Sequence, residues 1–351
     1  MKIRRISLKN VRNFEEKVIN FNVKESSEAS VIAILGDNGS GKTTILKSIV
    51  SALSLYNPIY GGTLLDRTDI KNGYHFYKIE VDLLLNSLET KQLFDKEDLE
   101  PTNHHSIKAG KVLIEDESQA IDIFFVEDKD NNKFNTLKTK FSSKNFDGGY
   151  IFYFDPFRYL PSEELEGPNS NSLLGNPKEN TLSSSILDNR LLNNKFNFIK
   201  QWLINMDFKR LKNPTMENEF VFKHVTDAFD SLFAPYLFEK IDDKGKILFR
   251  KKDTIIEIDK LSDGFKNLFI IIGEIFFRLH LADSNNSRFF EKEAVIIIDE
   301  VDCHIHPKWQ VNIVPFLKKM FPRCQFIITT HSPFIVSELD EREILKLEDS
   351  L

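Results

Sequence analysis

Two acids and a histidine follow short apolar runs near the end of this chain, where they could act on one substrate. Asp299 and Glu300 come directly after the apolar run at 294–298, and His331 follows soon after the run at 326–328. Short continuous apolar runs are typical of strands buried on both faces of a parallel sheet. Because ligands of such sheets bind beyond the carboxyl ends of the strands, we expect these three side chains at one sheet edge.

A third apolar run, at 31–35, leads into a glycine-rich stretch that can hold phosphate groups. Residues 36–43 read GDNGSGKT and match G-x-x-x-x-G-K-[ST] at every fixed position. The glycines let backbone N–H groups point at phosphate oxygens, and a helix expected from Thr44 to about Leu55 adds its positive N-terminal end. In this pattern the lysine bridges the β- and γ-phosphates and the last hydroxyl ligates Mg²⁺. The predicted nucleotide-binding residues are Gly36, Asn38, Gly39, Ser40, Gly41, Lys42, Thr43 and Thr44.

A fourth motif, Leu261-Ser262-Asp263-Gly264, precedes an expected helix from Phe265 to about Ala282. Taken alone, this motif reads as a helix N-cap in which a serine or aspartate side chain accepts from free backbone N–H groups. The order of the motifs adds to this reading. A phosphate loop, then L-S-x-G opening a helix, then a strand ending in Asp-Glu and a strand ending in His resembles the ABC-type ATPases.

The resemblance implies a role for each residue in hydrolysis of ATP with Mg²⁺, a reaction that depends mainly on positioning and charge neutralisation. Asp299 would hold Mg²⁺ together with Thr43. Glu300 would orient and deprotonate the attacking water, and His331 would contact the γ-phosphate. In such ATPases the signature turn binds the nucleotide of the other subunit. Ser262 and the N–H of Gly264 would therefore act in trans, in a head-to-tail homodimer or a larger oligomer with ATP at the interface.

The chain departs from the transporter signature L-S-G-G-Q at two positions. Asp263 replaces a glycine and Phe265 replaces the glutamine. An acid beside a γ-phosphate would repel it unless its side chain turns away. No clear glutamine of the kind that couples the two lobes is present, since the strand expected at 150–154 is followed by Asp155 and Arg158 instead.

Two further stretches indicate which group of ABC-type ATPases the chain resembles. The N-terminus, KIRRISLKNVRNFEEKVINF, resembles the start of the RecF/SMC/OLD group, with Asn10-Val11-Arg12-Asn13-Phe14 as its turn. The stretch DEVDCHIHPKWQ at 299–310, with FPRCQFIITTHSP after it, resembles the OLD-like AAA ATPases of prokaryotic defence, such as those of Septu systems and their retron-linked relatives. The resemblance covers residues 1–55 and 245–347. It implies a role in restricting phage, with a nuclease encoded beside the ATPase as its partner.

The H-x-H pair at His304 and His306 has a spacing found in metal sites. No further Cys/His cluster completes such a site, and the ABC-type ATPases place this segment at the dimer interface. We therefore favour an interface or loop-shaping role for the two histidines and keep metal binding as the alternative.

Composition limits the other classes of protein. The chain has 351 residues and a formal net charge of −6. Its two cysteines are too few for a disulfide framework and favour a reducing, cytoplasmic compartment. The N-terminus lacks the apolar core of a signal peptide. The nearest approach to a membrane span, at 268–281, is shorter than the roughly 20 residues needed and contains charges. Basic clusters at 2–5, 209–212 and 250–252 are either solvated faces or DNA contacts.

The expected fold class is α/β: a P-loop NTPase with an ABC-type ATPase head, a mixed sheet, an N-terminal β-rich subdomain and a helical lobe. Strands are expected over 1–23, 74–85 and 111–126, helices from 186 to 240, and a hairpin at 240–249. Residues 1–158 and 294–351 would form the nucleotide-binding lobe. Residues 159–293 would form the helical and signature lobe, with a mobile loop at 161–185 that is rich in Pro, Asn, Ser and Gly.

Three functions fit these sequence features. The first is a regulatory ATPase that controls a partner effector in anti-phage defence, and the second is a RecF-like ATPase that binds DNA during repair. The third, a transporter ATPase, would need a membrane partner. No nuclease activity of the chain itself is expected, since no H-N-H or P-D-(D/E)xK pattern occurs and the chain ends soon after His331, at Leu351.

Overall fold

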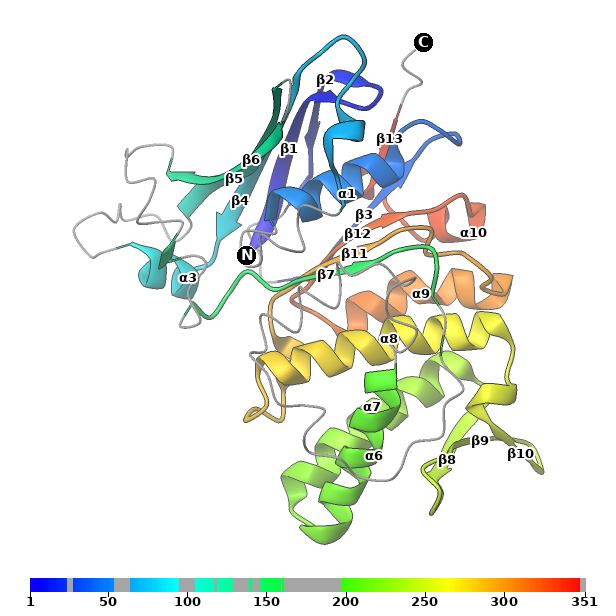
Figure 1. Cartoon of the computed structure of the whole chain (residues 1–351). Helices are drawn as coiled ribbons and strands as arrows, with labels where there is room; N and C mark the ends of the chain where they lie inside the picture. The colour runs from blue at the N-terminus through cyan, green and yellow to red at the C-terminus, as the bar shows by residue number, and fades with distance from the viewer. Residues whose placement is uncertain are drawn as a thin grey trace.

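A computed structural model gives the fold of this chain. It describes residues 1–23, 28–53, 64–94, 105–116, 119–128, 139–140, 146–158, 160 and 197–347. The loop expected at 161–185 and the end of the helix expected after residue 53 lie outside these residues. The described elements form two large sheets with helices between and below them (Figure 1).

The central element is a five-stranded parallel sheet with the order β13-β3-β12-β11-β7. Its strands are β3 (Ser30–Leu35), β7 (Ile151–Phe154), β11 (Val295–Ile298), β12 (Gln325–Thr329) and β13 (Ile344–Lys346). The apolar runs predicted to be strands are therefore confirmed, and β7, β11 and β12 are buried along their whole length. Since the strands run parallel, the segments after β3, β7, β11 and β12 meet at one edge.

This sheet separates two hydrophobic cores. Along β11, Val295 and Ile297 belong to one core, whereas Ile296 and Ile298 belong to the other. The alternation follows from the two-residue period of a strand, which sends successive side chains to opposite faces. Both faces of the sheet are covered, which explains why its strands read as continuous apolar runs rather than as alternating ones.

The first core lies between the parallel sheet and an antiparallel sheet with the order β2-β1-β4-β5-β6. That sheet contains β1 (Lys2–Val11), β2 (Phe14–Asn20), β4 (Phe76–Leu85), β5 (His105–Asp116) and β6 (Gln119–Asp128). Helix α1 (Lys42–Leu53) lies between the two sheets (Figure 1), and Ile45, Leu46 and Ile49 are buried there. Short helix α3 (Ser87–Leu93) follows β4. Parallel and antiparallel strands thus fall in separate sheets.

The second core lies below the parallel sheet (Figure 1), where two helices lie against its other face and two more pack beneath them. The nearer pair is α8 (Asp263–Ala282) and α9 (Pro307–Met320), and the farther pair is α6 (Asn197–Lys212) and α7 (Met216–Phe233). A short helix, α10 (Pro333–Val336), follows β12. The helical pattern expected up to residue 240 ends earlier, at Phe233, because the next strand begins at Leu237.

A small antiparallel sheet, β10-β9-β8, precedes helix α8. Its strands are β8 (Leu237–Ile241), β9 (Ile247–Lys251) and β10 (Thr254–Glu257). The predicted hairpin turn is confirmed, and the carboxylate of Asp242 accepts hydrogen bonds from the backbone N–H groups of Lys244 and Lys246. A single 3-10 turn then leads from β10 into the signature motif.

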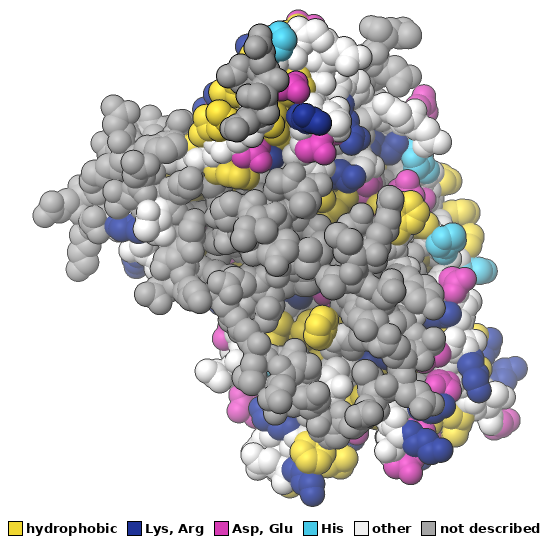
Figure 2. All heavy atoms as spheres, in the orientation of Figure 1, with side chains coloured by type: hydrophobic (Ala, Val, Ile, Leu, Met, Phe, Trp, Pro, Cys, Tyr) yellow, Lys and Arg dark blue, Asp and Glu magenta, His cyan; other side chains and the backbone are white. Residues whose placement is uncertain are grey.

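The tip of the α6–α7 hairpin, at the lower end of Figure 1, carries apolar and basic side chains that Figure 2 shows together. Leu211 and Met216 are 65% and 93% exposed. Arg210 is bonded to Asp207 and Glu219 within the hairpin, so part of this basic cluster is already paired with acids. In the described part of the chain, no helix combines the length and the apolar character that crossing a bilayer requires.

Candidate functional site

The phosphate loop connects β3 to α1, as its sequence predicts. Gly39 and Gly41 have φ of 86° and 96°, a region that L side chains rarely adopt. At Gly41 a Cβ would also overlap the ring of Phe14, which lies at the start of β2. The loop therefore packs directly against the turn between the first two strands, and a glycine is needed there for two separate reasons.

Lys42 and Thr43 are the last two residues of the phosphate-loop motif and the first two residues of helix α1. Lys42 is buried, and its Nζ donates to the carbonyl oxygens of Gly36 at 2.7 Å and Asp37 at 2.9 Å. The hydroxyl of Thr43 donates to Oδ2 of Asp299 at 2.7 Å. The two residues predicted to ligate Mg²⁺ from opposite ends of the sequence are thus in direct contact.

Asp299 and Glu300 follow β11 and share one partner on the neighbouring strand. The hydroxyl of Thr329 donates to Oδ1 of Asp299 at 2.5 Å and accepts from the backbone N–H of Glu300 at 2.7 Å. Asp299 is 1% exposed, whereas Glu300 is exposed. Glu300 also has a φ of 47°, an uncommon value for a residue other than glycine. The two acids therefore have different environments, one fixed beside Thr43 and the other presented to solvent.

The predicted catalytic residues surround one cavity of about 320 Å³. It is lined by Arg12, Asn13, Asn38, Gly39, Gly41, Lys42, Thr43, Thr44, Asp299, Glu300 and His331. Gly36 and Ser40 belong to the same loop but are not among the lining residues. The hydroxyl of Ser40 is buried and lacks a hydrogen-bond partner within the described structure, so it has bonding capacity to offer to a ligand.

Arg12 and Asn13 were not among the predicted site residues. Arg12 has a φ of 49°, its N–H donates to the carbonyl of Asp69 at 2.7 Å, and its guanidinium forms an ion pair with the carboxylate of Asp69. Asn13 lies 3.5 Å from the carbonyl of Gly39 through its amide nitrogen. The N-V-R-N-F turn was quoted for its family resemblance alone, and it could have signalled a place beside the phosphate loop.

The signature turn begins helix α8 and does not line the cavity. Ser262 is the N-cap, and its hydroxyl accepts from the N–H of Phe265 at 3.4 Å. The side chain of Asp263 is 87% exposed and forms an ion pair with Lys266 at 3.1 Å. The side chain of Asp263 therefore points away from its own chain. Within this single chain, Ser262 and Gly264 are separate from the residues around the phosphate loop.

The turn at Gly264 packs against the loop that follows Glu300. A Cβ at position 264 would overlap the carbonyl oxygen of His304, a residue with φ of 61°. Only a glycine permits this close approach of two backbones. The signature turn and the loop after the acid pair are thus in contact within one chain.

Residues 302–310 belong to the stretch that resembles the OLD-like AAA ATPases, and they shape the start of helix α9. His306 is the N-cap, its Nδ1 accepts from the N–H of Lys308 at 3.2 Å, and Pro307 occupies the first helical turn. The amide of Gln310 donates to the carbonyl of Ile305 at 2.7 Å and accepts from the hydroxyl of Ser332 at 2.6 Å. In the residues that the structure describes, no group of three or more His, Cys, Asp or Glu could hold a metal ion. These contacts favour the loop-shaping reading.

Trp309 gives the same stretch a contact with the signature helix. Its ring lies edge-to-face with Phe233 and Phe265, at centroid separations of 6.0 and 5.9 Å. Phe233 and Phe265 are themselves stacked at 4.0 Å. Helix α9 is therefore fixed at Gln310 to the segment that carries His331 and at Trp309 to the first turn of α8.

The segment after β7, where no coupling glutamine was found, carries Arg158. Its guanidinium donates to the carbonyls of Asp299 and Glu300 at the end of the neighbouring strand. Burial lowers the pKa of Arg158 and raises the pKa of the nearby Cys303 thiol. Sequence alone offered no signal for this contact, because the partners are main-chain oxygens more than 140 residues away.

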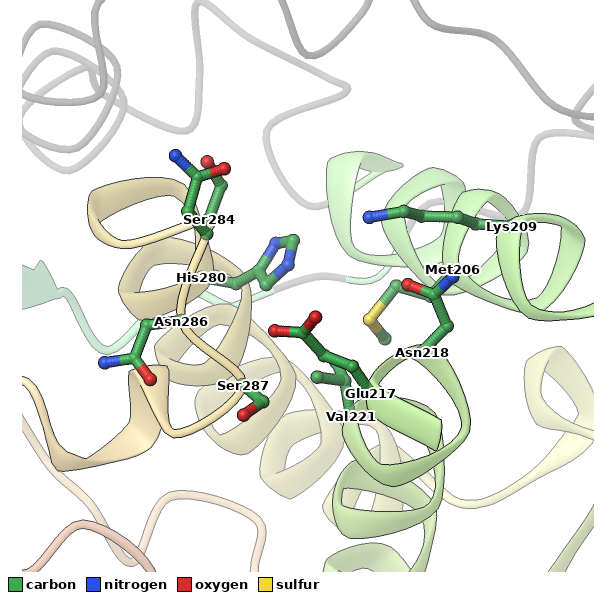
Figure 3. A pocket seen from close by; sticks show the side chains of 10 residues that line it. Met206, Lys209, Glu217, Asn218, Val221, His280, Ser284, Asn286 and Ser287 are labelled. Atoms are coloured by element: carbon green, nitrogen blue, oxygen red, sulfur yellow. The ribbon is translucent and has the colours of Figure 1, made fainter. Parts of the chain in front are cut away.

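A second cavity, of about 170 Å³, lies in the helical part of the chain between α6, α7 and the end of α8 (Figure 3). Lys209, Glu217 and His280 line it, together with polar residues of the 284–287 loop. None of the phosphate-loop or acid-pair residues borders it, so it is separate from the predicted nucleotide site. Burial lowers the pKa of His280 to about 4.

A phosphate loop after one strand of a parallel sheet, with an acid pair and a histidine after its neighbours, defines a P-loop ATPase head of the ABC type. The chain belongs to the family described as "AAA domain, putative AbiEii toxin, Type IV TA system", which matches residues 31–337. It is 22% identical to the Retron Ec83 probable ATPase of Escherichia coli, over 99% of this chain and 72% of that protein. It is 28% identical to the Septu protein PtuA of Bacillus mycoides (strain KBAB4), over 98% of this chain.

The chain spans only 40% of that Septu protein's length. Among solved structures, the SMC head bound to the C-winged helix domain of ScpA is similar in fold, with a TM-score of 0.56 and 17% identity over 98% of this chain and 93% of that one. The expected resemblance to Septu and retron-linked AAA ATPases with an SMC- and RecF-like head is therefore confirmed.

Proposed function

We propose that this chain binds and hydrolyses ATP at the cavity beside the phosphate loop. The observation that carries the proposal is the convergence of Lys42, Thr43, Asp299, Glu300 and His331 on that one cavity. They come from three separate segments of the sequence. A cation, a hydroxyl, two carboxylates and an imidazole in one place suit a nucleoside triphosphate and its metal ion.

The residues present also fit Mg²⁺. The Thr43 hydroxyl and a carboxylate oxygen of Asp299 lie 2.7 Å apart, and oxygen ligands of this kind are those that Mg²⁺ prefers. When bound, the ion would supply positive charge beside the phosphates. Asp299 can hold this position because Thr329 fixes its other oxygen.

In hydrolysis, Glu300 would take the proton of the attacking water, since its carboxylate is exposed at the cavity. Lys42 would balance the charge of the β- and γ-phosphates, and the N–H groups of the loop would orient them. His331 would contact the γ-phosphate from the end of β12. This division of roles gives the buried acid to the metal and the exposed acid to the water.

The signature residues Ser262 and Gly264 would complete the site in trans. They lie apart from the phosphate loop of their own chain, at the N-terminal end of α8, where Ser262 is exposed and Gly264 is buried. We therefore propose a head-to-tail homodimer with ATP at the interface. Residues 1–158 and 294–351 would act as the nucleotide-binding lobe and residues 159–293 as the signature lobe.

The biological role that we propose is control of a partner effector, a nuclease, in anti-phage defence. Support comes from similarity along nearly the whole chain to a retron ATPase and a Septu protein. ATP would hold the dimer and the effector in one state, and a phage trigger or hydrolysis would switch it. Purification with ATP and Mg²⁺ after co-expression with the neighbouring gene should give a complex. Absence of a complex together with unchanged phage plating would remove this role.

The ATPase proposal is tested by Glu300→Gln. Loss of the base should slow hydrolysis by about a hundredfold or more while ATP still binds, so the ATP-bound dimer should accumulate. Steady-state phosphate release, a fluorescent ATP analogue and light scattering measure the three quantities. Glu338→Gln, an exposed glutamate elsewhere, is the matched control. Turnover equal to wild type in Glu300→Gln would show that Glu300 is not the base.

A further inference from the structure

We propose that Arg158 is a positioning residue that aims Glu300 at its substrate and, through Asn267, links the acid pair to the signature helix. This inference rests on the proposed ATPase function and deepens it. Arg158 would take the place of the glutamine that couples the two lobes in ABC-type ATPases, for which the sequence has no clear candidate. Three segments meet at this one guanidinium: the end of β7, the end of β11 and the second turn of α8.

The guanidinium uses its three nitrogens on four acceptors. Nη1 donates to the carbonyls of Asp155 at 2.7 Å and Asp299 at 2.9 Å, and Nη2 donates to the carbonyl of Glu300 at 2.8 Å. Nε donates to Oδ1 of Asn267 at 2.7 Å. A planar fork with fixed donor directions can hold several acceptors at once, whereas the single ammonium of a lysine cannot reproduce this set.

The contact with Glu300 matters because of that residue's backbone. Its φ of 47° lies in the left-handed region, which persists in a residue with a side chain only when its surroundings hold it. Here both sides of the residue are held. The Glu300 N–H donates to the hydroxyl of Thr329, and the Glu300 carbonyl accepts from Arg158. The torsion at this position decides where the carboxylate points, so Arg158 helps to set the direction of the proposed base.

Asn267 extends the same network into the signature helix. It is 3% exposed, four residues after the start of α8, and its amide nitrogen donates to the carbonyl of Cys303 at 2.8 Å. One side chain of α8 therefore bonds both Arg158 and the loop after Glu300. A rotation of α8 would pull on Arg158 and on that loop together, and a shift of Glu300 would be transmitted back to α8 by the same bonds.

The position of Arg158 in the fold agrees with a coupling role. Strand β7 lies directly beside β11, and residue 158 follows it at the edge where the cavity opens. Arg158 acts on main-chain oxygens and on Asn267, and it is not among the residues that line the cavity. Its effect on hydrolysis would be exerted through Glu300 rather than by contact with the nucleotide.

The test compares Arg158→Ala and Arg158→Lys with wild type. Both variants should bind the fluorescent ATP analogue within about twofold of wild type, while kcat falls by about a hundredfold because the base is misplaced. Added guanidinium ion should restore part of the turnover of Arg158→Ala and leave Arg158→Lys unchanged. Arg250→Lys, in an exposed pair with Glu239, is the control for the same substitution. If Arg158→Ala does not fold, Arg158→Lys carries the same comparison.

Asn267→Leu separates the two parts of the network. It keeps the bonds from Arg158 to the acid-pair carbonyls and removes the link to α8, so ATP-dependent dimerisation should weaken more than nucleotide binding. A kcat within twofold of wild type in a folded Arg158→Ala would overturn the positioning role. Failure of wild type itself to hydrolyse ATP, or equal turnover in Glu300→Gln, would instead overturn the ATPase proposal, so the two failures are distinguishable.

Discussion

At the scale of single residues, the proposed base depends on the main chain around it. Glu300 adopts a left-handed backbone that costs roughly 1–3 kcal/mol, and hydrogen bonds from Arg158 and to Thr329 offset that cost. Thr329 serves both acids at once, because its hydroxyl also donates to Asp299. Thr329 belongs to no hydrolysis motif, yet its hydroxyl fixes the geometry of the two motif residues Asp299 and Glu300.

Thr329→Val should disturb both acids without changing the volume of the side chain. It leaves the N–H of Glu300 and one oxygen of the buried Asp299 without the Thr329 hydroxyl, so the free energy of unfolding should fall by roughly 1–3 kcal/mol. Turnover should fall by about tenfold to a hundredfold as Glu300 moves. Chemical denaturation and phosphate release measure the two effects. Thr226→Val, which loses bonds to carbonyls of its own helix, is the control. Unchanged turnover in Thr329→Val would contradict the role of this hydroxyl.

At the scale of elements, helix α9 links two parts of the site. Gln310 bonds Ser332, next to His331, and Trp309 packs on the first turn of α8. Strands β11 and β12 were predictable, because an apolar run followed by polar residues is a strong local pattern. The link itself was not predictable, because it depends on side chains that meet only after the helix has packed under the sheet. The stretch at 302–310 therefore indicated the OLD-like group from its sequence, whereas its structural role as a link appears only in the fold.

Helix α8 also carries a histidine whose protonation should affect stability. Burial, with a further contribution from Lys209 and against the opposing effect of Asp283, lowers the pKa of His280 from 6.5 to about 4. Its Nδ1 accepts from the indole N–H of Trp202 at 3.2 Å, a bond that requires a free lone pair. The folded chain therefore keeps this imidazole neutral over a pH range in which the unfolded chain takes up a proton.

Stability should consequently fall as the pH is lowered from about 6.5 to about 4, by roughly 3 kcal/mol from this group. Above pH 6.5 the contribution is complete, because both states are neutral there. Urea unfolding at a series of pH values measures the slope. His280→Asn should flatten the profile in this window, whereas His75→Asn, at an exposed position, should not. A profile of His280→Asn parallel to wild type would exclude this group as the cause.

At the scale of the whole molecule, one parallel sheet lies between two cores and presents its functional edge to one side (Figure 1). The class of fold and the residues of the phosphate loop, the acid pair and the histidine were predictable, since each follows a strand within a few positions. Arg12, Asn13 and Arg158 were missed because their roles depend on contacts between distant segments. The separation of parallel and antiparallel strands into different sheets likewise follows from tertiary packing rather than from local pattern.

The proposed dimer predicts complementation between two inactive chains. Lys42→Ala should lose nucleotide binding, and Ser262→Arg should block the signature surface. If each site combines one chain's phosphate loop with the other's signature turn, a mixed dimer contains one intact site. An equal mixture should regain turnover that neither variant shows alone, as measured by phosphate release. Lys42→Ala mixed with Lys42→Ala/Ser262→Arg is the control, since that pair leaves no intact site. No recovery in the first mixture would indicate that the signature turn does not act in trans.

The contact between Gly264 and His304 has a kinetic consequence for such a dimer. The loop that follows one chain's Glu300 rests on the turn that would face the nucleotide of the other chain. A change at either phosphate group would therefore move a part shared by both sites, so occupancy of one site should raise the turnover rate of the other. Phosphate release should then depend on ATP concentration with a Hill coefficient above one, and the second ATP would be split at a rate set by the state of the first.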